Sequence, residues 1–335
     1  MLSIAAALYL SGSIWAVNGA VAQTPVRFSI DWVFQGAHAP FAVAIQKNYY
    51  KREGLDVTMD RGTGSGETIG RVATGTYDIG YGDTNLLIKF NHDHPDTAVT
   101  AVLMVYNSTP AGIVTLTKTG VREPKDLAGR NIASPIGDAA QLLFPAFAQK
   151  VGIDSNSIEW TSSLPNLRDT LLFQGKVDAV ASYVPTTIMA LEALRATKDE
   201  IIVFNYSRYL PGLLGSGLLV RPAMLSEKPA VIRAFIKGTI AGLHDALMDP
   251  EAAVRMLTPY DRLINVAGET NRLKLILSYS MQGDLLRQQG LGHVSQVQLH
   301  EGVDLMAVAT GIVPPADLAT IYNQSLLPPA EERRF

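Results

Sequence analysis

The chain has 335 residues, of which 47% are hydrophobic and 18% are charged, and its formal net charge is −3. This hydrophobic content excludes an intrinsically disordered chain, and the length suits two lobes of ordinary domain size. The pI near 6.1 leaves no broad basic surface of the kind that binds phosphate backbones. We therefore expect a folded protein that does not bind nucleic acid.

The first 22 residues have the features of a secretion signal. Residues 4–10 form an apolar run, small residues follow, and the triplet ending at Ala22 suits signal peptidase. We predict cleavage after Ala22 and a mature chain that starts at Gln23. An uncleaved anchor is the alternative, but polar residues and glycines interrupt the run before it could span a membrane. Because the chain contains no cysteine, it has no lipid-modified cysteine, and we expect a freely soluble periplasmic protein.

Strand-like and helix-like segments alternate along the rest of the chain. Short apolar runs favour strands, whereas a spacing of three to four residues favours helices. Strands are predicted over residues 26–32, 56–61, 79–82, 98–106, 112–116, 130–133, 157–161, 179–182 and 217–220. Helices are predicted over residues 37–54, 66–75, 84–92, 123–127, 139–151, 169–175, 186–197 and 231–247. This alternation indicates an α/β fold with a mostly parallel or mixed sheet and helices on both of its faces.

Ligands of such sheets bind beyond the carboxyl ends of the strands, so the loops that follow strands hold the candidate site. Several of these loops open a helix, where free backbone N–H groups suit an anion. The candidate ligand-binding residues are Asp31, Trp32, His38, Ser65, Asp83, Thr84, Tyr106, Gly137, Asp138 and Tyr183.

Each candidate also has a structural interpretation. Trp32 and Tyr183 can be core aromatics instead of a stacking surface and a lid. Asp83 and Thr84 can cap the following helix, and His38 can be a hydrogen-bonded structural residue. The glycine-rich residues 62–66 can form a plain turn, because they lack the lysine and the spacing of a nucleotide-binding loop.

No motif for catalysis or for metal binding stands out. The chain has no Gly-x-Ser-x-Gly elbow and no cysteine nucleophile, and the spacing of His92 and His94 does not suit a helical metal site. We therefore expect a binding protein that is not an enzyme and uses no cofactor or metal.

Several segments together resemble the solute-binding components of ABC importers. They are Asp31 and Trp32 with His38, and residues 44–50, 53–57, 72–80 and 124–129. The resemblance is to the branch that binds pyrimidine precursors of thiamine, next to the nitrate, sulfonate and taurine receptors. It implies a two-lobed type II periplasmic-binding fold that traps its ligand by hinge closure.

The resemblance also implies the organisation of the chain. Lobe 1 would contain residues 23–115 and 217–335, and lobe 2 would contain residues 116–216. The two crossing strands would lie near residues 114–117 and 215–220. The protein would act as a monomer that delivers its small-molecule ligand to an ABC permease in the inner membrane.

Three positions depart from relatives of known chemistry. Pyrimidine synthases on this fold use a lysine and a histidine where this chain has Gly82 and Leu86, and they carry a cysteine-rich motif that is impossible here. Val184 stands where pyrimidine binders carry an acidic residue, so a buried amino group would lack its acceptor. A pyrimidine-synthase-like enzyme and a sensory periplasmic receptor are the alternatives to an import receptor.

The charge of the ligand stays open at this point. Gly137 and the helix start behind it suit an anion, whereas Asp138 in the cleft would favour a cationic or amino-bearing ligand. A pyrimidine thiamine precursor, a sulfonate or another small planar or anionic solute each fits the sequence.

Overall fold

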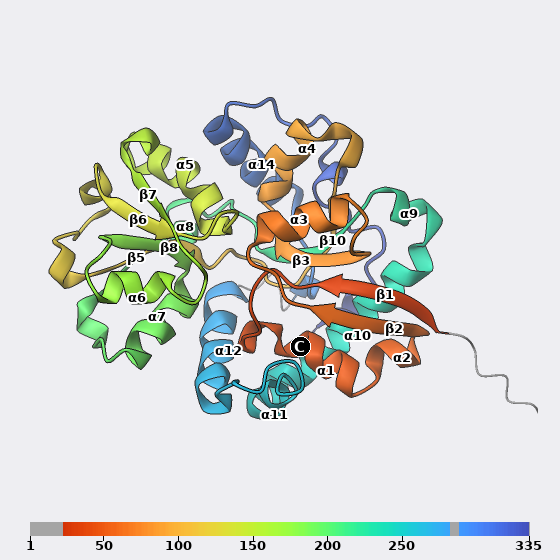
Figure 1. The fold of residues 1–335 in the computed structure, drawn as a ribbon. Helices are drawn as coiled ribbons and strands as arrows, with labels where there is room; N and C mark the ends of the chain where they lie inside the picture. Colours follow the sequence, from red (N-terminus) through yellow and green to blue (C-terminus); the bar gives the residue numbers. More distant parts are fainter. Residues whose placement is uncertain (1–22, 282–287, 335) are drawn as a thin grey trace, which may run out of the picture.

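The computed structural model describes residues 23–281 and 288–334, so the predicted signal peptide lies outside the described residues. Two sheets of five strands each, with helices packed on their faces, form two lobes that lie side by side (Figure 1). The predicted α/β class with two mixed sheets is thereby confirmed.

The first sheet is mostly parallel, with one strand inserted from the end of the fold. Its strands are β1 (Thr24–Ser29), β2 (Leu55–Asp60), β3 (Ile79–Asp83), β4 (Thr100–Met104) and β10 (Ser216–Val220). Their order is β2-β1-β3-β10-β4. Strands β2 and β3 run parallel to β1, and β10 runs antiparallel to both of its neighbours.

The second sheet repeats this arrangement. Its strands are β5 (Ala111–Leu116), β6 (Asn131–Ser134), β7 (Glu159–Ser162), β8 (Ala179–Tyr183) and β9 (Ile201–Asn205). Their order is β7-β6-β8-β5-β9, and here β5 is the antiparallel strand. Each sheet therefore takes its antiparallel strand directly from the chain segment that arrives from the other sheet.

The chain passes between the sheets twice, over residues 105–110 and again over residues 206–215. The resemblance placed the crossings near residues 114–117 and 215–220, and these segments lie largely within β5 and β10, the strands into which the connecting residues lead.

Helices cover both faces of the first sheet. They are α1 (Ala39–Gln46), α2 (Tyr49–Arg52), α3 (Ser65–Ala73), α4 (Leu86–Asp93), α9 (Ala223–Glu227), α10 (Pro229–Met248), α11 (Pro250–Arg255), α12 (Val266–Ser280) and α14 (Gln296–Thr310). Helix α10 starts with Pro229, a favoured first-turn residue, and packs along α1. Its Phe235 ring stacks on Tyr50 at a centroid distance of 4.5 Å, so the C-terminal helices belong to the core of the first lobe.

The second sheet is flanked by α5 (Ala139–Val151), α6 (Arg168–Phe173), α7 (Val184–Ala193) and α8 (Tyr206–Tyr209). Helix α5 spans the predicted residues because Asp138 accepts a hydrogen bond from the backbone N–H of Ala140 and Gly152 ends the helix in the left-handed conformation. Helix α12 contacts α7, and α14 contacts α5. The lobes thus touch through helices as well as through the crossing segments.

Two predicted helices differ from the structure, and one strand was not predicted. The predicted helix over residues 37–54 is divided at Asn48, whose φ of 59° is left-handed. The predicted helix over residues 123–127 is a single 3-10 turn, Pro124–Leu127. Strand β9 was not predicted, because it is an edge strand whose first three residues are only half-buried, and its apolar pattern is short.

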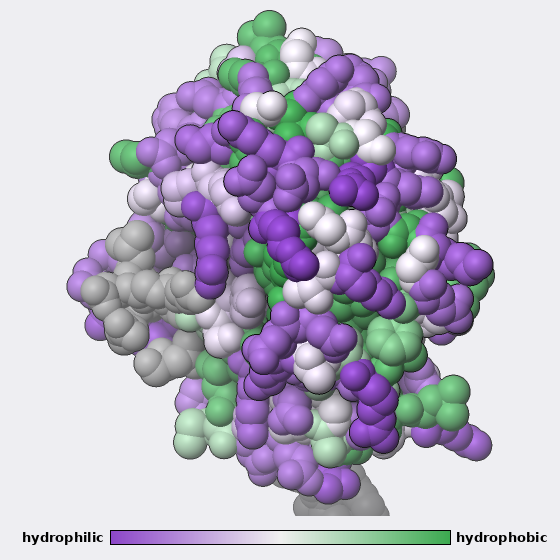
Figure 2. Space-filling view, turned by 90° about the vertical axis from the view of Figure 1, so that its left-hand side faces the viewer, coloured by the Kyte–Doolittle hydropathy of each residue, from purple (hydrophilic) through white to green (hydrophobic). Residues whose placement is uncertain are grey.

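Hydrophilic residues cover most of the face shown in Figure 2, and hydrophobic residues lie between them in smaller groups. Exposed apolar side chains in the second lobe include Ile136, Leu142, Leu164 and Leu167. Within the described part of the chain, no helix is both long enough and apolar enough to cross a membrane.

Candidate functional site

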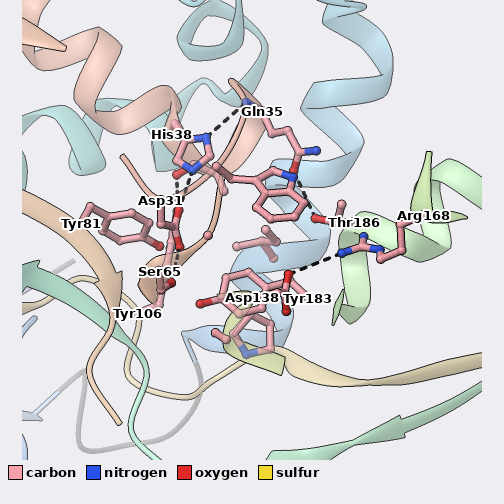
Figure 3. Close-up of a pocket in the computed structure, with 16 residues that line it drawn as sticks. Asp31, Gln35, His38, Ser65, Tyr81, Tyr106, Asp138, Arg168, Tyr183 and Thr186 are labelled. Atoms are coloured by element: carbon pink, nitrogen blue, oxygen red, sulfur yellow. Dashed lines mark hydrogen bonds and ion pairs between the residues drawn. The ribbon is translucent and has the colours of Figure 1, made fainter. Parts of the chain in front are cut away.

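A pocket lies between the two lobes, and the empty space among its lining residues, including the part that is open to solvent, is about 530 Å³. Its lining comes from both sheets, from α12 and from the first crossing segment (Figure 3). The lining residues are Asp31, Trp32, Gln35, Ala37, His38, Gly64, Ser65, Tyr81, Tyr106, Pro110, Asp138, Ala139, Arg168, Tyr183, Thr186 and Ile276.

Asp31 organises the first-lobe wall of the pocket, directly after β1. One carboxylate oxygen lies 3.2 Å from His38 Nε2, and the other accepts a 3.0 Å hydrogen bond from the Ser65 hydroxyl. His38 Nδ1 accepts a hydrogen bond from the backbone N–H of Gln35, which places the donated proton on Nε2. Both ring nitrogens of His38 are therefore engaged within the protein, and the ring is fixed in orientation.

Tyrosine side chains form the apolar part of the pocket. Tyr81 and Tyr106 pack edge to face with centroids 6.2 Å apart, and the Tyr106 hydroxyl donates to the carbonyl of Ala37. Burial raises the pKa of both phenols well above their ordinary value, so both stay neutral. Tyr183, at the end of β8, places its hydroxyl 3.1 Å from the Ser216 hydroxyl of β10. The aromatic wall thus joins the two lobes.

Two further contacts connect the lobes at the edge of the pocket. The Thr186 hydroxyl donates to the Gln35 side-chain carbonyl at 3.1 Å, and Arg272 Nη1 donates to the Thr186 backbone carbonyl at 2.9 Å. Glu269 holds Arg272 and also accepts from the backbone N–H of Gly36. Helix α12 therefore ties the loop after β1 to the start of α7.

Arg168 and Asp138 form the second-lobe wall. Arg168 is 1% exposed, and its Nη1 lies 3.6 Å from Asp138 Oδ2. Asp169 and Thr187 accept the hydrogen bonds of Arg168 Nε and Nη2. Burial raises the pKa of Asp138 to about 6, although Arg168 and the start of α5 oppose this shift. The Arg168 guanidinium also lies 5.5 Å from the Trp32 ring centroid, so the two walls meet there.

Gly137 contributes to the contact between the lobes through its backbone. Its carbonyl accepts a 3.1 Å hydrogen bond from the backbone N–H of Gly66, in the first turn of α3. Gly64 packs so closely on the same peptide that a Cβ there would lie 2.7 Å from the Gly137 oxygen. The glycine-rich residues 62–66 therefore allow the lobes to approach each other.

The structure does not bring Asp83 and Thr84 into the pocket lining. The Asp83 carboxylate accepts hydrogen bonds from Asn85 and Thr109, and the Thr84 hydroxyl donates to the carbonyl of Gly215. Both side chains are fully buried; Asp83 joins the end of β3 to the first crossing segment through Thr109, and Thr84 joins it to the second through Gly215. The other predicted residues apart from Gly137 line the pocket, namely Asp31, Trp32, His38, Ser65, Tyr106, Asp138 and Tyr183.

The sequence analysis missed Gln35, Tyr81, Arg168 and Thr186 among the polar lining residues. Gln35 lies between β1 and α1 and Thr186 lies in the first turn of α7, but neither residue type is by itself a ligand-binding signal. Arg168 starts α6, directly after the loop that follows β7, so the rule that ligands bind beyond the carboxyl ends of strands points to it.

Gly82 and Leu86, the two positions compared above with the lysine and histidine of the synthases, lie outside the pocket lining. Gly82 lies within β3, where a Cβ would lie 3.3 Å from Leu219 and Ser65, and Leu86 is buried at the start of α4. Val184 is fully buried at the start of α7. Among the described residues, no group of three or more His, Asp or Glu side chains is placed to hold a metal ion.

Comparison with known proteins relates the chain to binding proteins and to a group of enzymes. The family model described as "NMT1/THI5 like" matches residues 35–253. The riboflavin-binding protein RibY of Chloroflexus aurantiacus is 21% identical over 316 residues, which cover 90% of this chain and 86% of that protein.

A 4-amino-5-hydroxymethyl-2-methylpyrimidine phosphate synthase of Legionella pneumophila is 22% identical, over 69% of this chain and 72% of the enzyme. Among solved structures, the alkanesulfonate-binding protein SsuA of Xanthomonas axonopodis pv. citri bound to MOPS superimposes with a TM-score of 0.67. It is 15% identical, and the match covers 91% of this chain and all of SsuA, 100%. The likeness to SsuA establishes the shared two-lobed fold.

Proposed function

Because this chain belongs to the NMT1/THI5-like family, we propose that it is the periplasmic solute-binding protein of an ABC importer. It binds a small organic molecule between its two lobes, closes around it and delivers it to a permease in the inner membrane. The mature protein starts at Gln23, after cleavage of the signal peptide, and works as a monomer without a cofactor.

The observation that carries this proposal is a pocket whose two walls belong to different lobes. Hydrogen bonds cross the pocket edge between Gln35 and Thr186 and between Gly66 and Gly137. A ligand enters such a pocket only when these contacts separate, and it is enclosed when they form again. The two crossing segments, residues 105–110 and 206–215, are where a hinge rotation between the lobes would occur.

Binding without chemical conversion is the part of the proposal that separates it from the synthase relatives. His38 is the histidine in the pocket, and both of its ring nitrogens are held by the protein. The lysine and histidine positions of the resembling synthases are occupied by Gly82 and Leu86, and neither residue lines the pocket. The pocket residues thus serve to hold a molecule in place.

The test is a binding screen of the purified protein followed by analysis of the bound molecule. The probes are riboflavin, 4-amino-5-hydroxymethyl-2-methylpyrimidine, MOPS and nitrate. A probe at one hundred times its Kd adds about 2.7 kcal/mol to the unfolding free energy, which raises the Tm by several degrees. We expect one class of probe to bind and to be recovered unchanged by mass spectrometry.

Trp160 provides a matched control for Trp32. Trp32 lines the pocket, whereas Trp160 lies in β7 outside the lining. Ligand-dependent changes in tryptophan fluorescence should disappear in Trp32→Phe and persist in Trp160→Phe. Conversion of a probe to a product would contradict the receptor function and favour the enzyme. Failure of every probe to bind would also count against the proposal.

A further inference from the structure

Arg168 contains a buried hydrogen-bond donor that the protein leaves unused. Asp169 accepts from Nε at 3.0 Å and from Nη2 at 3.3 Å, and Thr187 accepts from Nη2 at 3.1 Å. Nη1 is buried and makes no hydrogen bond within the described chain. A buried donor without a partner costs roughly 1–3 kcal/mol, so a partner supplied by a ligand would be favoured.

Asp138 places an acceptor beside this donor. Its Oδ1 accepts a 2.8 Å hydrogen bond from the backbone N–H of Ala140 at the start of α5, which fixes the carboxylate. Its Oδ2 lies 3.6 Å from Arg168 Nη1, which is too far for a hydrogen bond between them. Figure 3 shows both groups at the pocket wall, with Arg168 pointing toward Asp138. The wall therefore offers one donor and one acceptor side by side, both held by other parts of the protein.

The charges around this pair disfavour an anionic ligand. Besides His38, the titratable lining residues with a formal charge are Asp31, Asp138 and Arg168. The Arg168 charge is shared with Asp169, which lies directly behind it. An anion would approach two carboxylates in a buried site and meet a guanidinium that is already paired, and both effects raise its energy.

We propose that Arg168 and Asp138 together determine ligand specificity. They form hydrogen bonds with an uncharged edge of the ligand that carries an acceptor next to an N–H donor. This inference rests on the proposed receptor function and names the ligand class of the same pocket. Arg168 Nη1 donates to the ring or carbonyl acceptor, and Asp138 Oδ2 accepts from the neighbouring N–H. Lactams and 4-aminopyrimidines carry such an edge on a planar ring, which suits the Trp32 and Tyr183 side chains of the pocket.

The experiment compares each heterocyclic probe with an analogue in which methyl groups replace the hydrogens of the N–H donor. Riboflavin is paired with 3-methylriboflavin, which tests a lactam edge. The second pair is 4-amino-5-hydroxymethyl-2-methylpyrimidine and its 4-dimethylamino analogue, which tests an aminopyrimidine edge. Titrations are run at pH 8, where the Asp138 carboxylate is ionised. In one of the two pairs, we expect the unmodified probe to bind roughly 10- to 100-fold more tightly than its methylated analogue, as for a hydrogen bond to a charged group.

The Asp138→Asn variant makes the test specific to this contact. An asparagine keeps the oxygen that caps α5, and its amide group turns a second donor toward Arg168. Asp138→Asn should weaken the unmodified probe by a similar factor and change the affinity of the methylated analogue less than about threefold. Far-ultraviolet circular dichroism and the Tm of the unliganded variant show whether it is folded. Equal weakening of both analogues by a folded variant would overturn the inference.

The anionic probes separate failure of this inference from failure of the receptor function. Weak or absent binding of MOPS and nitrate beside a tight heterocycle supports the inference. Tighter binding of MOPS or nitrate than of either heterocycle would overturn the inference and leave the receptor function standing. Absence of binding by every probe would overturn both.

Discussion

Substitution of Gly64 should weaken ligand binding because it prevents the lobes from closing. An ideal Cβ at this position lies 2.7 Å from the Gly137 oxygen, 3.0 Å from its carbonyl carbon and 3.2 Å from the Asp138 nitrogen. All three are backbone atoms of the opposite lobe, which cannot move aside as the end of a flexible side chain would. The Gly64 backbone is extended, so an alanine fits the local conformation and clashes only across the pocket edge.

The magnitude follows from the cost of inserting a methyl group into a packed contact. Overpacking of this kind costs about 1–3 kcal/mol, and displacement of Gly137 also weakens its hydrogen bond with the Gly66 N–H. The clash destabilises only the closed, liganded form, because the loops that contain Gly64 and Gly137 are apart in the open form. A change of 1–3 kcal/mol corresponds to a Kd roughly 5- to 150-fold higher for Gly64→Ala.

The assay is isothermal titration with the probe that binds best, together with the Tm of the unliganded protein. Gly70 is the matched control, because it lies within α3, the helix that Gly64 precedes, and a Cβ there meets no atom within 4 Å apart from the backbone of its own helix. Gly70→Ala should keep the Kd and raise the unfolding free energy by up to about 1 kcal/mol. Small-angle X-ray scattering should show that ligand contracts the wild-type protein more than Gly64→Ala. An unchanged Kd in Gly64→Ala, or an equal loss in Gly70→Ala, would refute the reasoning.

Three more predictions test packing and buried charge. A Cβ at Gly238 would lie 2.3 Å from the Tyr50 ring, so Gly238→Ala should lower the unfolding free energy in urea by about 1–3 kcal/mol and leave the Kd within twofold; a Kd as weak as that of Gly64→Ala would contradict this. Burial, opposed by hydrogen bonds, raises the pKa of Asp83 to about 7, so the folded state holds a proton that the unfolded state releases. The unfolding free energy should therefore fall as pH rises from 4 to 7, and equal slopes in wild type and Asp83→Asn would argue against this cause. Burial also raises the pKa of Asp138 to about 6, so the Kd of an N–H-bearing probe should rise as pH falls below 6 in the wild type. In Asp138→Asn the Kd should depend less on pH, as measured by calorimetry at pH 5 and 8.

The elements of this fold follow from local sequence signals wherever those signals are complete. Helix α5 was predicted to the residue, because a capping aspartate precedes it and a glycine with positive φ ends it. Strand β9 was missed because it pairs on one side only, with β5, and three of its five residues remain partly exposed. The positions of the crossing segments depend on which strands pair with β5 and β10, and pairing between distant segments leaves no local signal.

The pocket was predictable to the extent that it lies at strand ends. Asp31, Ser65 and Tyr183 line the pocket, in keeping with the rule that loops after strands meet at one edge of the sheet. The same rule selected Thr84, whose hydroxyl instead turns to the carbonyl of Gly215, 131 residues further along the chain. Residues at a strand end can face either the pocket or the returning chain, and only the tertiary structure decides between them.

One loop takes part both in closure of the lobes and in recognition of the ligand. A double substitution whose effects are not additive therefore tests both roles. Gly137 accepts the hydrogen bond that joins the lobes, and the next residue, Asp138, faces Arg168 in the pocket. A methyl group at Gly64 that displaces the Gly137 peptide must also move the Asp138 backbone nitrogen, which it would meet at 3.2 Å. Asp138 is already displaced in Gly64→Ala, so removal of its charge should raise the Kd by a smaller factor than in the wild type. For a probe with an N–H donor, the Kd of Gly64→Ala with Asp138→Asn should therefore rise less than the product of the two single effects, whereas distant substitutions multiply. A double variant that shows the full product would mean that the lobes close by one contact and select their ligand by another.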